Sequence, residues 1–192
     1  MVRISSGRLK GRKLATSKKI FVSTDSDELR PTSSKVRESI FNILQTEIDH
    51  SLFLDLYAGT GAVGLEALSR GAEKVFFVEN KQVRAKAVMD YIHKLGLDDM
   101  ASVYQEEAEA FLKRAMRTGL KFDIIFADPP YMSGEIDKLL TNIGESNILK
   151  EDGCVLVEHS SKTILPENVQ NIKLVKNYKY GDTMLTFYRK EQ

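Results

Sequence analysis

Residues 52–64 read Leu-Phe-Leu-Asp-Leu-Tyr-Ala-Gly-Thr-Gly-Ala-Val-Gly, an apolar strand followed by a glycine turn and the start of a helix. Glycines at this place let the backbone approach a ligand closely, and the N-terminus of the following helix offers free N–H groups. Gly59, Gly61 and Gly64 match the G-x-G-x-x-G pattern of dinucleotide-binding folds. Asp55 lies inside the strand, where its carboxylate can meet a cationic amine, and this favours a cofactor other than NAD.

The next strand along the chain also ends in polar residues. Residues 74–78 read Lys-Val-Phe-Phe-Val and are followed by Glu79 and Asn80. A carboxylate at this place can accept hydrogen bonds from both hydroxyls of a ribose. NAD-binding folds carry a similar acid, so Glu79 does not distinguish between cofactors. Glu79 could also cap the helix that follows it.

A second motif follows a later apolar run. Residues 122–127 read Phe-Asp-Ile-Ile-Phe-Ala, and Asp128-Pro129-Pro130-Tyr131 comes directly after them. Consecutive prolines cannot continue a central strand, because each lacks a backbone donor and has a fixed φ. The result is a rigid turn with a carboxylate, exposed carbonyls and an aromatic ring, which suits a planar substrate with an exocyclic amino group. An ordinary strand-ending turn with a packing aromatic is the alternative interpretation.

From residue 52 onward the chain alternates between strand and helix patterns. Such alternation is typical of a mostly parallel sheet covered on both faces. Residues 171–179 and 183–190 break the alternation as an antiparallel hairpin. We therefore expect an α/β fold with a Rossmann-like sheet of seven strands, one of them antiparallel and in the C-terminal hairpin. The other expected strands are 52–57, 74–79, 101–104, 122–127 and 153–158. The expected helices are 62–70, 81–95, 107–117 and about 135–146. Three glycines, Gly71, Gly96 and Gly119, fall where helices are expected to end.

Charge is distributed unevenly along the chain. The formal net charge is +1, yet residues 1–37 hold ten Lys or Arg and only three Asp or Glu. A basic segment on an acidic body is typical of a protein that grips a polyanion, and a solvated terminus is the alternative. Basic and apolar residues alternate between glycines, which predicts strands near 3–5 and 10–16 and a third near 19–22. Residues 23–28 are expected to form a loop.

We expect one globular unit in which a basic hairpin arm, residues 1–30, precedes the main domain, residues 31–192. A length of 192 residues suits a single domain with a large core. The main domain should begin with a helix capped by Thr32 or Ser33 and running to about Ile48. Its buried stripe follows from apolar residues at helical spacing, which are Val36, Ile40, Ile43, Leu44 and Ile48.

Composition excludes several classes of protein. A hydrophobic fraction of 42% and a charged fraction of 29% are typical of soluble globular proteins. No apolar run approaches the roughly 18 residues that span a membrane, and the N-terminus lacks a signal-peptide pattern. The single cysteine, Cys154, cannot form an internal disulfide and fits a buried position, while three scattered histidines give no metal-ligand spacing. We expect a cytoplasmic, metal-free monomer.

Taken together, these motifs resemble the class I S-adenosylmethionine-dependent methyltransferases. The most specific part is N-terminal and resembles the extension of the RsmD family, whose members methylate the N2 amine of a guanine in small-subunit (16S) ribosomal RNA. The resemblance runs from Arg3 to about Arg189. The N-terminal residues that carry it are Arg3-Ile4-Ser5, the run from Gly7 to Leu14, Arg30-Pro31-Thr32, Val36-Arg37-Glu38 and Phe41-Asn42.

The resemblance implies a role for each motif, with S-adenosylmethionine as cofactor and S-adenosylhomocysteine as product. It implies that Asp128, Pro129, Pro130 and Tyr131 are catalytic. It implies cofactor contacts for Asp55, Tyr57, Gly59, Thr60, Gly61, Gly64, Glu79, Asn80, Glu107, Ala108 and Asp128. It implies RNA contacts for Arg3, Arg8, Lys10, Arg12, Lys13, Arg30 and Arg37. Glu107 stands where relatives usually have Asp or Asn and could instead be a first-turn helix acid. Arg30 and Arg37 could face the cofactor, the RNA or simply the solvent.

Three other functions remain open at this point. An adenine-N6 methyltransferase uses nearly the same tetrad, but generally needs a target-reading domain for which 192 residues leave no room. An NAD-linked oxidoreductase leaves residues 128–131 unexplained. A non-catalytic RNA-binding assembly factor would not depend on Asp128. The expected partner is ribosomal RNA within the small subunit or an assembly intermediate, whose surface could supply specificity.

Overall fold

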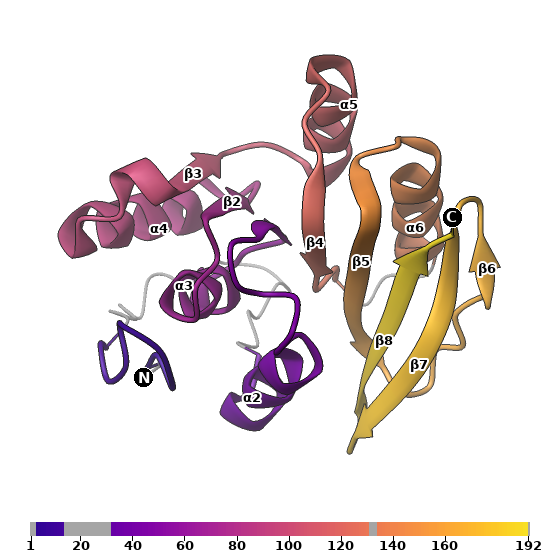
Figure 1. Cartoon of the computed structure of the whole chain (residues 1–192), viewed down its shortest axis with the longest axis horizontal. Helices are drawn as coiled ribbons and strands as arrows, with labels where there is room; N and C mark the ends of the chain where they lie inside the picture. Colours follow the sequence, from indigo (N-terminus) through magenta and orange to yellow (C-terminus); the bar gives the residue numbers. More distant parts are fainter. Residues whose placement is uncertain (1–2, 14–31, 131–133, 192) are drawn as a thin grey trace.

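A computed structural model describes residues 3–13, 32–130 and 134–191 of the chain. Its centre is an eight-stranded sheet with the order β3-β2-β1-β4-β5-β8-β7-β6 (Figure 1). The strands are β1 (Leu52–Leu56), β2 (Lys74–Val78), β3 (Ala101–Tyr104), β4 (Phe122–Ala127), β5 (Leu149–Ser160), β6 (Asn168–Val169), β7 (Ile172–Tyr180) and β8 (Thr183–Lys190).

Strand directions confirm the expected mostly parallel sheet. β3, β2, β1, β4 and β5 pair in parallel, and β8 pairs antiparallel with both β5 and β7. The hairpin predicted at 171–179 and 183–190 is β7 and β8. One strand was not expected from the sequence: β6 has two residues and pairs antiparallel with β7. A two-residue strand is too short to show an alternating pattern.

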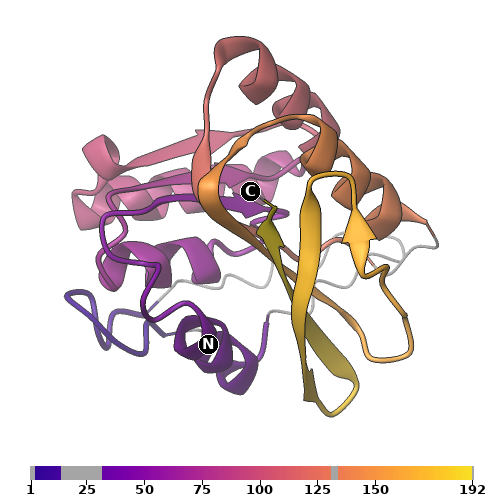
Figure 2. The same ribbon diagram turned by 45° about the vertical axis from the view of Figure 1, so that its right-hand side comes forward.

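Helices cover both faces of the sheet (Figures 1 and 2). The helices are α2 (Ser34–Ile43), α3 (Ala62–Ser69), α4 (Gln82–Leu95), α5 (Ala108–Thr118) and α6 (Glu135–Glu145), with a short 3-10 turn η1 (Asp98–Met100). Apolar residues of α2, α3 and α4 share one core cluster with Phe53, whereas those of α5 and α6 share the other with Leu54. Adjacent residues of β1 thus face opposite layers, as strand geometry requires.

Two predicted helix ends are confirmed by their backbone geometry. Gly96 and Gly119 are the C-caps of α4 and α5, with φ of 65° and 68°. This left-handed conformation favours glycine, which has no Cβ. Cys154 is completely buried in β5, where burial raises the pKa of its thiol to about 12. None of the helices in the described ranges is both long enough and apolar enough to cross a lipid bilayer.

The first described helix is shorter than predicted. The hydroxyl of Ser33 caps α2 by accepting the Val36 N–H (3.2 Å), as expected, but α2 ends at Ile43 rather than near Ile48. Leu44 and Ile48 are nevertheless buried. A turn in which the Ile48 N–H donates to the Leu44 carbonyl (3.1 Å) keeps both side chains against the core. The apolar spacing therefore predicted the buried positions correctly except for Ile43, which is partly buried, and it overestimated the length of the helix.

The N-terminal segment 3–13 forms a tight turn rather than two clear strands. Arg3 and Lys13 make one isolated antiparallel bridge, and the Ile4 N–H donates to the Arg12 carbonyl (3.1 Å). The predicted strand at 10–16 extends beyond the described residues, and the third strand and the loop at 23–28 lie wholly outside them. The remaining backbone donors divide between bonds inside the turn, such as the Gly11 N–H to the Ile4 carbonyl (2.9 Å), and bonds to helix α3, which replace those to a partner strand.

Glu66 of α3 is the main anchor for this segment. Its carboxylate is completely buried and accepts hydrogen bonds from the Ser5 N–H (2.7 Å), the Ser5 hydroxyl (2.7 Å) and the Ser6 N–H (2.9 Å). The guanidinium groups of Arg70 and Arg37 lie 2.9 Å and 3.8 Å from it. Buried charges are retained when they are paired and hydrogen-bonded in this way. We call this arrangement the Glu66 anchor.

Gly7 permits an equally close approach to the end of α3. Its φ is +77°, and a Cβ placed there would lie 1.8 Å from the Ser69 carbonyl oxygen. The Arg8 N–H donates to that carbonyl (2.9 Å) and the Leu9 N–H to the Ser69 hydroxyl (2.9 Å). The segment is therefore attached along the second half of α3 by its backbone, which leaves its basic side chains to face outward.

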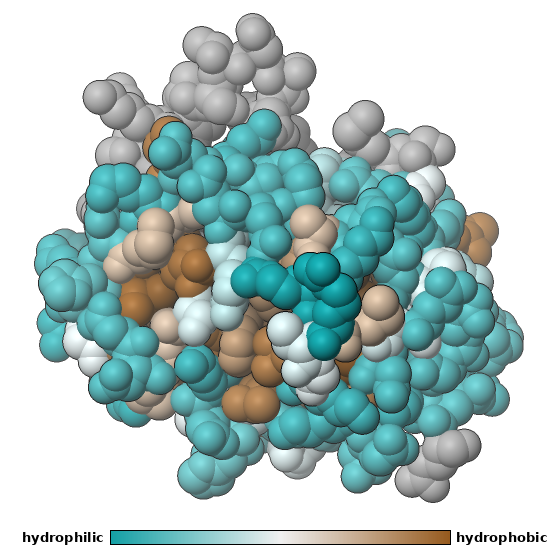
Figure 3. Space-filling view, turned by 90° about the horizontal axis from the view of Figure 1, so that it is seen from above, coloured by the Kyte–Doolittle hydropathy of each residue, from teal (hydrophilic) through white to brown (hydrophobic). Residues whose placement is uncertain are grey.

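One face of the molecule is seen from above in Figure 3. Hydrophilic residues dominate this face, with apolar residues in the gaps between them. Such a mixture is ordinary for a protein surface in contact with water.

Candidate active site

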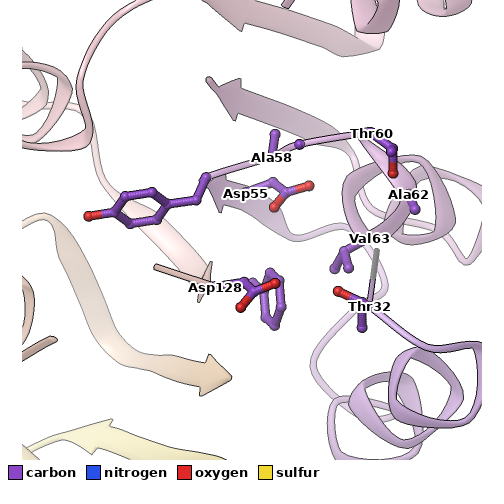
Figure 4. Close-up of a pocket in the computed structure, with 10 residues that line it drawn as sticks. Thr32, Asp55, Ala58, Thr60, Ala62, Val63 and Asp128 are labelled. Atoms are coloured by element: carbon purple, nitrogen blue, oxygen red, sulfur yellow. The ribbon is translucent and has the colours of Figure 1, made fainter. Parts of the chain in front are cut away.

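A hollow lies at the carboxyl ends of β1 and β4, the two central parallel strands. Asp55 and Asp128 contribute carboxylates from these neighbouring strands, and Thr32 lies across from them (Figure 4). In open α/β sheets, ligands bind at such strand ends. The lining residues are Thr32, Asp55, Tyr57, Ala58, Gly59, Thr60, Ala62, Val63, Phe126 and Asp128.

The glycine loop between β1 and α3 is held by two buried carboxylates. The Gly64 N–H donates to Asp55 (2.9 Å), and the Gly59 N–H donates to Glu79 (2.8 Å). Gly61 is the N-cap of α3 with φ of 72°, and Tyr57 has φ of 64°, which is uncommon for a residue with a side chain. Strained backbone of this kind clusters at ligand sites.

Asp55 is a buried carboxyl group with an altered acidity. Burial raises its pKa to about 7; the Gly64 N–H bond opposes this shift, and the charge of Glu79 adds to it. No lysine, arginine or histidine in the described ranges forms an ion pair with Asp55. A buried carboxylate of this kind needs a cation or a proton, so Asp55 fits a ligand that brings a positive charge.

Glu79 follows β2 and both of its oxygens bond to backbone. In addition to Gly59, the Lys81 N–H donates to it (2.8 Å), and Lys81 is the N-cap of α4. Glu79 therefore bonds to the residue that precedes the first turn of α4, and α4 has no side-chain bond from its N-cap residue. Each carboxylate oxygen has a second lone pair, so these backbone bonds do not use all the acceptor positions of Glu79.

Asn80 and Glu107 are brought together although they lie 27 residues apart. The Asn80 side-chain amide donates to the Glu107 carboxylate (3.0 Å). Glu107 is the N-cap of α5 but makes no side-chain capping bond, and Ala108 is the buried first residue of that helix. Asn80 follows Glu79 after the end of β2, and Glu107 follows β3, the strand that pairs with β2. The pair therefore lies next to Glu79 at the carboxyl ends of these strands.

Asp128 and the prolines follow β4 as the sequence predicted. Pro129 is buried and Pro130 is exposed, and Tyr131 lies outside the described residues. The pKa of Asp128 is well above its usual value because of burial first, and then because of the charges of Glu158 and Asp55. Three acidic side chains, Asp55, Asp128 and Glu158, therefore lie near one another in a region that is shielded from water.

The candidate RNA-binding residues divide into two groups. The basic side chains of the segment 3–13 are all exposed, namely those of Arg3, Arg8, Lys10, Arg12 and Lys13. Arg37 is different because it is only 4% exposed and its guanidinium donates to the Arg3 carbonyl (2.6 Å). Arg37 thus holds the segment in place from inside the molecule, and Arg30 lies outside the described residues.

Sequence reasoning missed Glu66, Thr32 as a pocket residue, and Glu158. Glu66 lies in a helix without any local sign of its partners, which are about 60 residues away. Glu158 could have been found, since it is a polar residue near the carboxyl end of a predicted strand, as Glu79 and Asp128 are.

Comparison with known proteins assigns the chain to a family. A family model described as "Conserved hypothetical protein 95" matches residues 2–189. "Ribosomal RNA small subunit methyltransferase D" of Haemophilus influenzae is 35% identical over 87% of this chain and 84% of its own length. The chain belongs to the RsmD family.

Other relatives support the same assignment for this RsmD-family chain. YlbH of Bacillus subtilis is 39% identical over 98% of this chain and 99% of its own length. The solved structure of yhhF from Escherichia coli has a TM-score of 0.84 at 30% identity, covering 99% of this chain and 98% of that chain. The described residues therefore share the fold of a protein that is named as a putative methyltransferase.

Proposed function

We propose that this protein transfers a methyl group from S-adenosylmethionine to the exocyclic N2 amine of a guanine in small-subunit ribosomal RNA. The observation that carries the proposal is the hollow in which Asp55 and Asp128 meet, at the ends of β1 and β4. Asp55 suits a cationic cofactor and Asp128 suits an amine. Membership of a family in which relatives are named as ribosomal RNA methyltransferases supplies the substrate class.

The described residues fit S-adenosylmethionine. Asp55 would bind the amino group, because this buried carboxylate has no cationic partner in the described ranges. Glu79 would accept hydrogen bonds from the ribose, and the Asn80–Glu107 pair would lie against the adenine. The glycine loop, with Tyr57 and Thr60, would line the cofactor. When bound, S-adenosylmethionine supplies an electrophilic methyl group on its sulfonium sulfur.

The acceptor amine would be held by Asp128 and by the Pro129 carbonyl. The N2 amine is a poor nucleophile because its lone pair is delocalised into the ring, and hydrogen bonds from its two N–H groups orient that lone pair. The amine nitrogen would take the methyl group, and S-adenosylhomocysteine would leave as the second product. The amine nitrogen then releases a proton to Asp128 or to water. Positioning of this kind can supply most of a rate enhancement, and Tyr131 would stack on the base.

The exposed arginines and lysines of the segment 3–13 would contact phosphates. Such contacts position a nucleic acid without reading its sequence. The target base has to leave its stack to reach a hollow in the protein, as in other enzymes that modify bases. The ribosomal subunit, or an assembly intermediate, would then present the correct nucleotide.

The direct test is methyl transfer with labelled cofactor. Purified protein is mixed with S-adenosylmethionine labelled on the methyl group and with small ribosomal subunits from a strain that lacks the gene. The RNA is then digested to nucleosides. We expect label in N2-methylguanosine. Label in N6-methyladenosine would overturn the guanine assignment, and absence of label with a bound cofactor would overturn the substrate class.

Cofactor binding should depend on pH through Asp55. A carboxylate binds an ammonium group better than a carboxylic acid does, so affinity should rise as pH passes the Asp55 pKa of about 7. We expect the affinity for S-adenosylhomocysteine, measured by calorimetry, to rise about fivefold from pH 6 to pH 7, since the ionised fraction rises from about a tenth to a half. The stability of the ligand-free fold should follow the opposite trend, because an Asp55 pKa raised above its unfolded value means that stability is lost as pH rises toward pH 7.

The control for this titration is Asp55→Asn. This variant should bind S-adenosylhomocysteine more weakly, with an affinity that is constant from pH 6 to pH 7. A flat profile for the wild-type protein would show that Asp55 does not bind the amino group.

A further inference from the structure

Glu158 lies beside Asp128 but does not line the hollow described above. Ala127 of β4 and Val157 of β5 are register partners, so the next residues, Asp128 and Glu158, are neighbours across the two strands. Adjacent strands are about 4.8 Å apart. Side chains alternate along a strand, so Glu158 shares the face of Leu156, which belongs to the same core cluster as Phe126.

The carboxylate of Glu158 is incompletely satisfied. The residue is 5% exposed, and its Oε2 is one of the few buried side-chain atoms in the described ranges without a hydrogen-bond partner. Burial raises its pKa to about 7, and a hydrogen bond from Thr32 opposes that shift. Thr32 itself lines the hollow. A buried acceptor without a donor needs an explanation, and a ligand that brings a donor provides one.

The strand register of Asp128 and Glu158 provides a pair of acceptors, side by side and facing one region. Guanine offers a matching pair of donors, since its N1–H and N2–H groups project from the same edge. We infer that Glu158 accepts the N1–H of the target guanine while Asp128 accepts an N2–H. The inference rests on the proposed function and adds to it the residue that recognises the base.

Discrimination against adenine follows from the same arrangement. N1 of adenine carries a lone pair and no hydrogen, so it would face the Glu158 oxygen as a second acceptor. Reading a flipped base by its Watson–Crick edge is the usual strategy of base-modifying enzymes. Glu158 therefore selects guanine within the RNA, whereas the exposed basic residues of the segment 3–13 do not distinguish bases.

The test changes the hydrogen-bonding character of N1 in the base and, separately, that of the Glu158 side chain. 2-Aminopurine keeps the N2 amine of guanine but has an unprotonated N1 and no O6, and Glu158→Gln changes only the contact to N1. Small subunits are reconstituted with either guanine or 2-aminopurine at the nucleotide that the wild-type protein methylates. The ratio of kcat/KM for guanine to kcat/KM for 2-aminopurine is measured at pH 8 for the wild-type protein, Glu158→Gln, Glu158→Ala and the exposed control Glu73→Gln.

For the wild-type protein and Glu73→Gln we expect guanine to be preferred by about 10- to 100-fold, the range of one good base-reading contact. The amide of Glu158→Gln can donate to the N1 of 2-aminopurine, so its preference for guanine should fall by at least about tenfold. Glu158→Ala should lose activity on guanine and gain none on 2-aminopurine. In both Glu158 variants the S-adenosylhomocysteine affinity should match that of the wild-type protein, because Glu158 does not line the cofactor hollow. The melting temperature at pH 8 should not fall, because each substitution removes a buried carboxylate that has one oxygen without a hydrogen bond.

If the wild-type protein is active and Glu158→Gln prefers guanine over 2-aminopurine by the same ratio of kcat/KM, the inference is overturned and the proposed function remains intact. A wild-type protein that forms no N2-methylguanosine would overturn the proposed function and this inference together. A loss of activity that accompanies a lower melting temperature, with the preference unchanged, would assign Glu158 a structural role and would also overturn the inference.

Discussion

Replacing Asp128 with alanine should lower kcat for methyl transfer by about 10²- to 10³-fold, the range expected when one group that orients the reacting atoms is lost. The alanine variant cannot accept an N–H of the amine, so the nitrogen lone pair is no longer directed at the methyl group. KM for the small subunit should change little, because the exposed basic residues of the segment 3–13 are untouched. Steady-state kinetics with labelled S-adenosylmethionine separate the two effects.

Two controls keep this result from being explained by misfolding. The pKa of Asp128 is raised by burial and by neighbouring acids, so its carboxylate is held in an unfavourable place. Alanine removes that cost, and the melting temperature at pH 8 should not fall. Asp128→Asn keeps one acceptor oxygen and should retain more activity than Asp128→Ala. Full activity in Asp128→Ala would favour a non-catalytic assembly factor.

Replacing Glu66 with alanine should lower the free energy of unfolding by about 3–5 kcal/mol, the usual effect of removing one partner of a buried ionic network. The variant leaves the Ser5 and Ser6 N–H groups without an acceptor and Arg37 without its nearest carboxylate. Burial already lowers the pKa of Arg37, and the charge of Glu66 opposes that effect. Urea denaturation followed by circular dichroism measures the change.

The exposed helical variant Glu38→Ala is the matched control and should remain within about 0.5 kcal/mol of the wild-type protein. Proteolysis adds a local measurement, since Glu66→Ala should make the Arg and Lys sites of the segment 3–13 more susceptible to trypsin. A loss of less than about 1 kcal/mol in Glu66→Ala would show that the Glu66 anchor contributes little to stability.

The sequence predicted the parts of the fold that depend on local pattern. Alternation of strand and helix placed β1, β2 and β4, and the polar residues near or directly after their carboxyl ends placed Asp55, Glu79 and Asp128 at one end of the sheet. That inference is sound because parallel strands all end at the same edge. The family resemblance, rather than the pattern, supplied the substrate.

What the sequence did not predict depends on contacts between distant residues. The Glu66 anchor joins positions about 60 residues apart, and nothing near Glu66 marks its partners. Arg37 looked like a candidate for RNA contact because its charge is visible in the sequence, whereas its burial at 4% exposure is not. The early end of α2 has a similar cause, since periodic apolar residues report a buried face and not the continuity of a helix.

The strand order has a consequence for how the chain reaches this fold during synthesis. β8 follows β7 in the sequence but lies between β5 and β7 in the sheet. β5, which carries Glu158, therefore has an open edge until residues 183–190 have left the ribosome. Open strand edges are prone to pair with other chains, and non-local pairing is slow. The half of the site next to β5 is thus the last to be completed, and a nascent chain stalled before residue 183 would expose it to aggregation.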